Sequence, residues 1–162
     1  STRQLAHLLK NTDAIGIEID VRNILEPATK TDVSAIADSA DSALKARRDV
    51  VIYTSRKLIA GADSDQSLQI AASVSQTLVD IVAEIKVKPR YLLAKGGITS
   101  SDIATKALGL IRAEVLGQIL PGVPVWRAGT ESKFPHLDYI VFPGNVGADD
   151  AVTTTVRKLA GL

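Results

Sequence analysis

The sequence contains no cysteine and no methionine among its 162 residues, and it has only two histidines. Without cysteine the chain can form neither a disulfide framework nor a thiolate metal site, which is typical of a cytoplasmic protein. His7 and His136 lie far apart in the sequence, with no second histidine near either. We interpret both as surface or half-buried polar residues and expect no metal-ligating side chains.

Long apolar runs and a strong charge imbalance are also missing. No stretch approaches the roughly 20 apolar residues that span a bilayer, and no signal peptide opens the chain. We therefore expect a soluble, cytoplasmic protein that does not bind membranes. The 19 basic and 18 acidic residues nearly cancel, and no run of Lys or Arg offers a surface to a nucleic-acid backbone. Nucleic acid is thus excluded from the expected partners.

What remains is the composition of one globular domain. Hydrophobic residues make up 46% of the chain and charged residues 23%, which are ordinary values for a folded protein. We predict a single domain over residues 1–162, without repeats or linkers, because this length suffices for one core. The first ten residues already have helical spacing with no strand before them. We therefore interpret the chain as a fragment of a longer protein.

Apolar runs and amphipathic segments alternate along the first two thirds of the chain, which favours a parallel sheet covered by helices. The expected strands are 14–20, 49–53, 90–94, 113–119, 123–126 and 139–142. The expected helices are 1–10, 31–48, 66–86, 100–110 and 149–160. The run at 49–53 is the kind buried on both faces of a parallel sheet. We predict a three-layer α/β fold, with a mostly parallel sheet, helices on both faces, and extra edge strands or a hairpin in the C-terminal third.

The segment from Tyr91 to Asp102, YLLAKGGITSSD, has the pattern of a strand, a glycine loop and a helix start. Gly96 and Gly97 let the backbone turn and let a ligand approach the main chain. Three hydroxyl residues follow that can cap the helix: Thr99, Ser100 and Ser101. The first N–H groups of such a helix bind phosphate readily, although any strand-to-helix turn favours the same residues. The loop matches neither the Walker A nor the Rossmann fingerprint.

A second glycine loop, Phe142 to Gly147, follows the strand YIVF and precedes another helix. Gly144 and Asn145 suit a tight turn, and Asn145 can also hydrogen-bond a base, a ribose or its own backbone. We interpret Asp149 and Asp150 as helix caps rather than Mg²⁺ ligands. Because open α/β sheets bind ligands outside the carboxyl ends of their strands, two such loops favour a nucleotide site.

Other residues near the loops have two interpretations each. Lys95 and Arg56 are candidate phosphate cations or solvated loop charges. The segment from Leu120 to Trp126, LPGVPVW, is a wall for adenine or a hairpin corner. For Trp126 itself we favour a place in the core or an interface over a stacking platform.

Three segments, in this order and spacing, resemble the C-terminal nucleotide-binding domain of the four-carbon acid sugar kinases: GGITSSDIATKAL, GQILPGVPVW and YIVFPGNVGADDAV. The resemblance covers nearly the whole chain and is most specific from Tyr91 to Val152. It implies that the Gly-Gly-Ile-Thr loop contacts ATP and that Gly144 belongs to a second ATP loop. The cofactor-binding candidates are Gly96, Gly97, Ile98, Thr99, Ser100, Gly144 and Asn145.

The chain departs from the family pattern in three places. The family commonly has Asp or Glu where Ile98 stands, which puts a polar or metal-linked contact in doubt. It commonly has Lys and Ser where Phe142 and Pro143 stand, so a cation is lost. Residues 1–5 resemble the end of a Ser-rich motif whose preceding strand and serine, another ATP contact, are not in this sequence.

The resemblance implies a kinase that uses ATP and Mg²⁺ to phosphorylate a four-carbon acid such as threonate, erythronate or 3-oxo-tetronate. The acid is expected to bind an N-terminal domain that this sequence lacks. We therefore assign no catalytic residue and expect the chain alone to bind ATP weakly and to be inactive. The alternatives are a stand-alone regulatory module that binds a phosphate or a nucleotide without catalysis, and a structural domain whose glycines only form turns. A homodimer is left open.

Overall fold

The structure is a computed structural model that describes residues 2–26, 31–55 and 64–161 of the chain. Its first part contains α1 (Thr2–Asn11), β1 (Ile15–Ile19), α2 (Val21–Leu25), α3 (Val33–Lys45), β2 (Val50–Thr54) and α4 (Ser64–Glu84). Its second part contains β3 (Tyr91–Lys95), α5 (Gly97–Asp102), η2 (Ile103–Ala107), β4 (Ala113–Leu120), β5 (Val123–Ala128), β6 (Asp138–Phe142) and α6 (Ala151–Leu159). The η2 stretch is a π-helical continuation of α5.

The described strands form two hydrogen-bonded sheets. One sheet pairs β1 with β2 in parallel, and the other has the order β3-β6-β5-β4. In the larger sheet β3 and β6 are parallel, whereas β6–β5 and β5–β4 are antiparallel. The α/β class and the hairpin of the C-terminal third, β4–β5, are confirmed. The division into two sheets was not anticipated.

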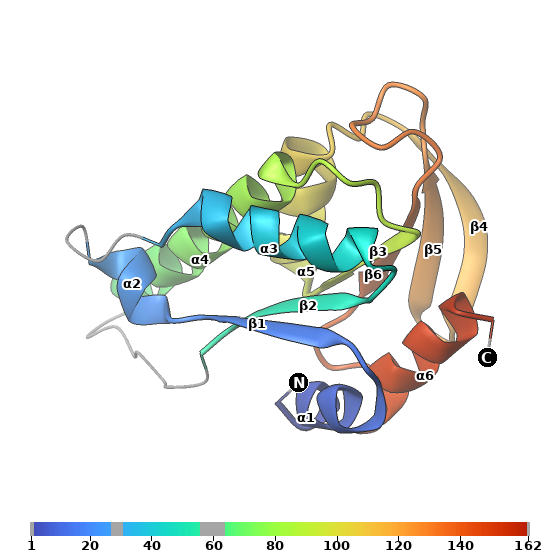
Figure 1. The fold of residues 1–162 in the computed structure, drawn as a ribbon, viewed down its shortest axis with the longest axis horizontal. Coiled ribbons are helices and arrows are strands. Elements are labelled where there is room, and N and C mark those ends of the chain that lie inside the picture. The colour runs from blue at the N-terminus through green and yellow to red at the C-terminus, as the bar shows by residue number, and fades with distance from the viewer. Residues whose placement is uncertain (1, 27–30, 56–63, 162) are drawn as a thin grey trace.

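Helices cover both faces of the strands. In Figure 1, α3, α4 and α5 lie on one side, and α1 and α6 lie on the other. Two apolar clusters match these layers. Tyr139 of β6 packs with α3, α4 and η2, whereas Ile140 and Phe142 pack with α1 and α6. Because successive side chains of a strand point to opposite faces, β6 contributes to both halves of the core.

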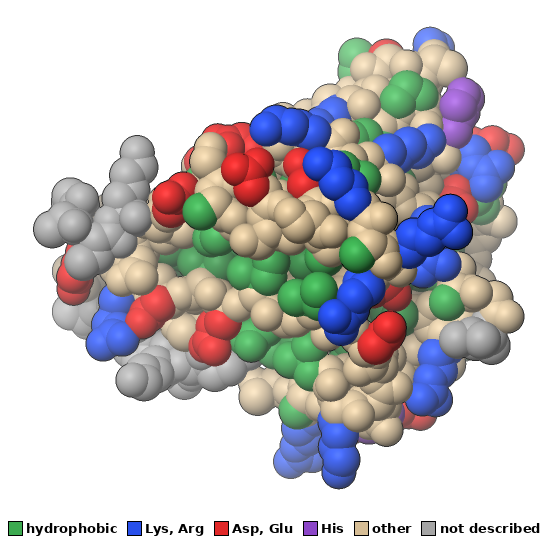
Figure 2. Space-filling view, viewed as in Figure 1, with side chains coloured by type: hydrophobic (Ala, Val, Ile, Leu, Met, Phe, Trp, Pro, Cys, Tyr) green, Lys and Arg blue, Asp and Glu red, His purple; other side chains and the backbone are tan. Residues whose placement is uncertain are grey.

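The run at 49–53 is less buried than predicted. Every residue of β2 is half-buried, because β2 pairs with β1 along one edge and with no other strand in the described part of the chain. Figure 2, viewed as in Figure 1, shows apolar side chains in the centre of the visible face of the molecule, between bands of charged side chains. The apolar composition of a strand therefore does not ensure a neighbour on both of its edges.

The predicted helices and strands are present in the structure, with boundaries that differ by a few residues. The helix α2 was not predicted. The short α2 begins after Asp20, whose carboxylate accepts a hydrogen bond from the Arg22 N–H. Its five residues are too few to show helical periodicity. None of the helices in the described part of the chain is long and apolar enough to cross a membrane.

Candidate functional site at the ends of β3 and β6

The two glycine loops lie side by side. β3 and β6 are parallel neighbours, and their last residues, Lys95 and Phe142, are register partners. The ladder continues one step into the loops, where the Gly96 N–H donates to the Phe142 carbonyl at 2.9 Å. The fold therefore places the loop after β3 and the loop after β6 at one edge of the sheet, where ligands of α/β folds bind.

The first loop is held by its own buried serine. The Ser100 side chain is 2% exposed, and its hydroxyl lies 2.9 Å from the Ala94 carbonyl and 2.6 Å from the Gly96 carbonyl, to which it donates. The Tyr139 hydroxyl donates to the Ser100 carbonyl at 2.7 Å. Burial raises the pKa of Tyr139, so the phenol stays a donor. Ser100 thus shapes the turn through hydroxyl contacts made inside the protein.

The predicted cap of this helix is wrong. Helix α5 begins at Gly97, and its N-cap is Gly96, with a φ of 108° and no side-chain hydrogen bond. Only glycine adopts that backbone conformation readily. Thr99, Ser100 and Ser101 therefore lie inside the helix instead of before it. The expected hydroxyl cap is replaced by a glycine whose backbone geometry starts the helix.

The start of α5 exposes the groups that a phosphate needs. The first N–H groups of a helix have no partner within it, and the first bond of this helix is donated by Ser100 to Gly96. Gly97 is exposed, Ile98 is 72% exposed and Thr99 is half-buried. A Cβ added to Gly97 would meet no atom within 4 Å, and the φ of Gly97 is outside the left-handed region. The fold therefore tolerates a side chain at this glycine.

The second loop contains one glycine that the fold requires and one that it does not. Gly147 has a φ of 80°, and a Cβ there would overlap the Cβ of Ala151. Gly144 is exposed, and a Cβ there would meet nothing within 4 Å. Asn145 beside it is also exposed. Gly144 is thus similar to Gly97, because both glycines are exposed and the fold leaves room for a side chain at each.

The acidic caps predicted for α6 are not formed. The helix begins at Ala151, and Asp150 occupies the N-cap position in a helical backbone conformation, without a side-chain hydrogen bond. Asp149 lies one residue further from the helix. A cap accepts hydrogen bonds through its side chain only when its own backbone leaves the helical region. Both carboxylates are therefore close to the helix start without capping it.

Lys95 places a cation between the two loops. Its ammonium donates to the carbonyls of Pro143 and Gly144, each at 3.1 Å, and lies 4.5 Å from the centre of the Phe142 ring. Burial lowers the pKa of Lys95. The cation that the family pattern has in the second loop is absent there, and the neighbouring strand supplies one. Arg56, the other candidate cation, lies outside the described residues.

The segment between the loops is a hairpin corner, one of its two predicted forms. The Gly122 N–H donates to the Gln118 side chain at 2.8 Å, and the turn lies beside Val146 of the second loop. Trp126 is half-buried and stacks on Tyr139, with ring centres 6.3 Å apart. It packs against the core cluster that contains Tyr139, in agreement with a predicted place in the core or an interface.

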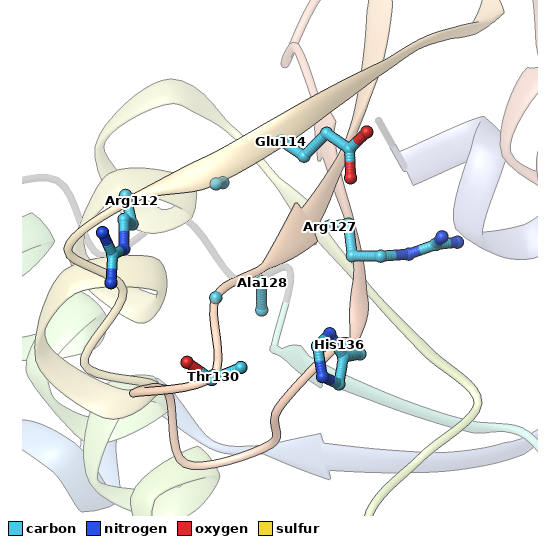
Figure 3. A pocket seen from close by; sticks show the side chains of 8 residues that line it. Arg112, Glu114, Arg127, Ala128, Thr130 and His136 are labelled. Carbon is cyan, nitrogen blue, oxygen red and sulfur yellow. The ribbon is translucent and has the colours of Figure 1, made fainter.

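A hollow of about 410 Å³ lies at the opposite end of the larger sheet (Figure 3). Arg112 and Arg127 line it, but each is paired with a carboxylate, Glu131 at 3.8 Å and Asp138 at 3.0 Å. Figure 3 shows the Arg127 side chain directed away from Ala128 and out of the hollow. No residue predicted to bind the cofactor lines this hollow, and its two guanidinium groups have partners already.

The two histidines are far apart in the structure as well. His136 lines the hollow at the amino end of β6, and His7 of α1 lies with its Nδ1 2.8 Å from the Thr153 hydroxyl of α6. Across residues 2–26, 31–55 and 64–161, no group of three or more potential ligands is placed to hold a metal ion.

Residues 1–152 match the family described as nucleotide-binding C-terminal domain. No curated protein matches the chain.

Three solved structures share the fold. A Haemophilus influenzae protein of the DUF1537 group is 18% identical with a TM-score of 0.73, and the match covers 98% of this chain. A Salmonella typhimurium LT2 protein is 20% identical with a TM-score of 0.69 and 97% coverage of this chain. A Bordetella bronchiseptica DUF1537 protein, a domain-swapped dimer with bound citrate, is 17% identical with a TM-score of 0.68 and 98% coverage.

The match covers only 37% of each of these three chains, so the three proteins are much longer than this chain. At such identities the likeness shows the fold. The family match covers most of the sequence and includes both glycine loops. The chain belongs to the family of nucleotide-binding C-terminal domains, as its resemblance to the four-carbon acid sugar kinases predicted.

Proposed function

We propose that the chain is the ATP-binding domain of a kinase that phosphorylates a four-carbon sugar acid, of the threonate, erythronate or 3-oxo-tetronate type. The observation that carries the ATP site is the pair of open glycines, Gly97 and Gly144. Neither backbone conformation nor packing requires glycine at these positions. A ligand that approaches the main chain does require it, because a Cβ would stand between the ligand and the backbone N–H groups.

The chemistry of the site suits a nucleotide triphosphate. The free N–H groups at the start of α5 and the Lys95 ammonium offer hydrogen bonds to phosphate oxygens. Affinities from the micromolar to the millimolar range correspond to about −8 to −4 kcal/mol. Hydrogen bonds to charged groups contribute about 1.5–3 kcal/mol each, so a few of them suffice. Mg²⁺ would enter with the phosphates that it bridges.

The choice of a four-carbon sugar acid as the substrate rests on the resemblance to the four-carbon acid sugar kinases. The Bordetella protein holds citrate, a hydroxy acid, which agrees with a hydroxy-acid substrate for the longer proteins. Phosphoryl transfer depends on positioning and on charge stabilisation, so this domain supplies the donor and the other domain the acceptor. The swapped dimer of that protein supports a homodimer for this one. A cytoplasmic location is part of the same proposal.

Calorimetric titration of ATP with Mg²⁺ tests the site. We expect the 162-residue chain to bind, and we expect Gly97→Asp and Gly144→Ala to weaken binding at least about tenfold, the equivalent of losing one good hydrogen bond. Ala72→Asp is the matched control, because it adds the same charge to an exposed position of α4. Equal affinities for all four proteins would refute the loop assignment.

A phosphoryl-transfer assay tests the reaction. We expect transfer from ATP to threonate or erythronate when this domain is part of a longer protein with an acid-binding domain, and none from the 162-residue chain alone. ATP binding without transfer in either protein would favour a regulatory binding module over the kinase.

A further inference from the structure

Gln4 is a buried polar side chain that reaches the second loop from the far end of the sequence. It is 5% exposed, and it lies on α1. Its Nε2 lies 3.0 Å from the Val146 carbonyl, 3.2 Å from the Gly147 carbonyl and 2.9 Å from the Ala148 carbonyl. The two N–H bonds of one amide are thus shared among three consecutive acceptors of the loop.

The orientation of this amide is dictated by the loop. In the described part of the chain its Oε1 is buried without a hydrogen-bond partner. The opposite orientation would set that oxygen against three carbonyl oxygens, which is worse than leaving one acceptor unpaired. Burying an unpaired polar atom is costly, and an apolar residue would pack α1 without that cost. The side chain is better explained by its effect on the loop than by packing.

The hydrogen bonds of Gln4 affect the direction in which the N–H groups of the loop point. In a planar trans peptide the C=O and the following N–H point in opposite directions. Because the three carbonyls point at Gln4, the N–H groups of Gly147, Ala148 and Asp149 point away from it. All three residues are exposed. Within the described ranges none of these N–H groups donates to a protein acceptor. Consecutive outward N–H groups form a concavity that attracts anions.

A second contact holds α1 independently of the loop. The His7 ring lies 2.8 Å from the Thr153 hydroxyl of α6, and Leu8 is buried in the cluster that contains Val152. The Leu8 cluster also packs against Val146, but the His7–Thr153 contact joins helix to helix without a residue of the loop. The role of Gln4 can therefore be separated from the docking of α1.

We infer that Gln4 is a positioning residue of the nucleotide site, which holds the carbonyls of residues 146–148 inward so that the next three N–H groups face a phosphate. This inference rests on the proposed function. The Ala148 carbonyl also accepts from the Ala151 N–H at 3.1 Å, so the loss of the Gln4 amide would release mainly the Val146 and Gly147 carbonyls. A carbonyl turned outward would repel the phosphate that an N–H group attracts.

The test compares Gln4→Met, Gln4→Glu and the control His7→Ala in the 162-residue chain. Methionine keeps the length of the side chain but removes both donors, and glutamate sets a carboxylate against the three carbonyls. We expect affinity for ATP with Mg²⁺ to fall at least about tenfold in both Gln4 variants, at a temperature where circular dichroism shows them folded. We expect His7→Ala to lose thermal stability and keep the affinity.

A second measurement follows the loop itself. NMR should show changed amide shifts and faster hydrogen exchange at Gly147 and Ala148 in the Gln4 variants, and native values in His7→Ala. Unchanged affinity and unchanged shifts would overturn the inference and leave Gln4 a packing residue. If the wild-type chain binds no nucleotide, the proposed function and the phosphate part of the inference fail together. The NMR comparison would then still support or overturn the shaping of the loop by Gln4.

Discussion

The two glycine loops lie at the same edge of the same sheet, but different parts of the protein hold them. The first loop is fixed mainly from within, because Ser100 bonds to Ala94 and Gly96, residues four to six positions away. The second loop is fixed from outside. Gln4, 142 positions from Val146, holds its carbonyls, and Lys95 of the neighbouring strand holds its first turn.

This difference says how each loop depends on the rest of the fold. The first loop depends mainly on its own strand and helix, and its hydrogen bonds to Tyr139 and Phe142 both lead to the neighbouring β6. The second loop needs α1 to be docked and β3 to be paired. A perturbation far from the site should therefore alter the second loop before the first, and the variants below test that asymmetry.

The largest effect is expected from Gly147→Ala in the second loop. The new Cβ would overlap that of Ala151, and the φ of 80° is unfavourable for alanine. We expect a loss of about 3 kcal/mol in the free energy of unfolding, from strain and overpacking together. Urea denaturation measures it. Gly144→Ala is the control, with an expected change within about 0.5 kcal/mol. Similar losses in both variants would contradict the division between required and open glycines.

The features that depend only on short stretches of the chain could be predicted from the sequence. The strands, the positions of both loops and the hairpin corner follow from runs of a few residues, and the structure confirms them. The support of the second loop was missed, because the contact from Gln4 to Val146 joins positions that no local pattern connects. The available signal was weak, because the sequence shows only that Gln4 stands four residues before Leu8 and so shares a helix face with an apolar residue.

One wrong prediction and one incomplete prediction have the same origin. The hydroxyl residues after Gly97 were expected to cap a helix, but the helix starts earlier, and Ser100 bonds back to carbonyls before it. Such a back-bond and a cap use the same residue types. Lys95 was named as a candidate phosphate cation, but its place against the second loop follows only from the pairing of β3 with β6. Both answers depend on tertiary packing.

A smaller effect is expected from Lys95→Met, which removes the cation shared by both loops. We expect affinity for ATP with Mg²⁺ to fall about tenfold near neutral pH, because the ammonium attracts phosphate. Calorimetry measures it. Lys45→Met, an exposed lysine at the end of α3, is the control and should bind like the wild type.

The pH dependence of the wild type sharpens the same prediction. Burial lowers the pKa of Lys95 below its ordinary 10.5. ATP affinity should therefore fall as the pH rises through that lowered pKa, before exposed lysines titrate. The free energy of unfolding should rise over the same pH range. The reason is that the unfolded chain binds the Lys95 proton more tightly than the folded chain, so the loss of this proton at higher pH favours the folded state. Lys95→Met should remove both trends, and their persistence would exclude Lys95 as their source.

Tyr139→Phe tests the side-chain hydrogen bond that the first loop receives from β6. Removing the hydroxyl takes away one of two donors to the Ser100 carbonyl and leaves the Ile103 N–H. We expect a loss of about 1 kcal/mol in the free energy of unfolding. NMR should show amide shifts that change at Gly97 to Ser100 and stay native at Gly147. Tyr53→Phe, in a half-buried strand position of β2, is the control. Equal changes in both loops would show that they do not respond separately.

The smallest effect on stability is expected from Ile98→Asp, which restores the acid of the family pattern at an exposed position of the first loop. A carboxylate in the first turn of α5 should stabilise the fold by about 0.5 kcal/mol through the helix dipole. It should also repel the phosphates of free ATP and tolerate them when Mg²⁺ screens the charge. We therefore expect the ratio of ATP affinities with and without Mg²⁺ to rise above the wild-type ratio, whereas the uncharged Ile98→Asn should leave it unchanged. Since Ile98 is 72% exposed, packing cannot account for a difference between these two variants. A ratio that stays the same in Ile98→Asp would place the phosphates away from the first loop and assign them to the second.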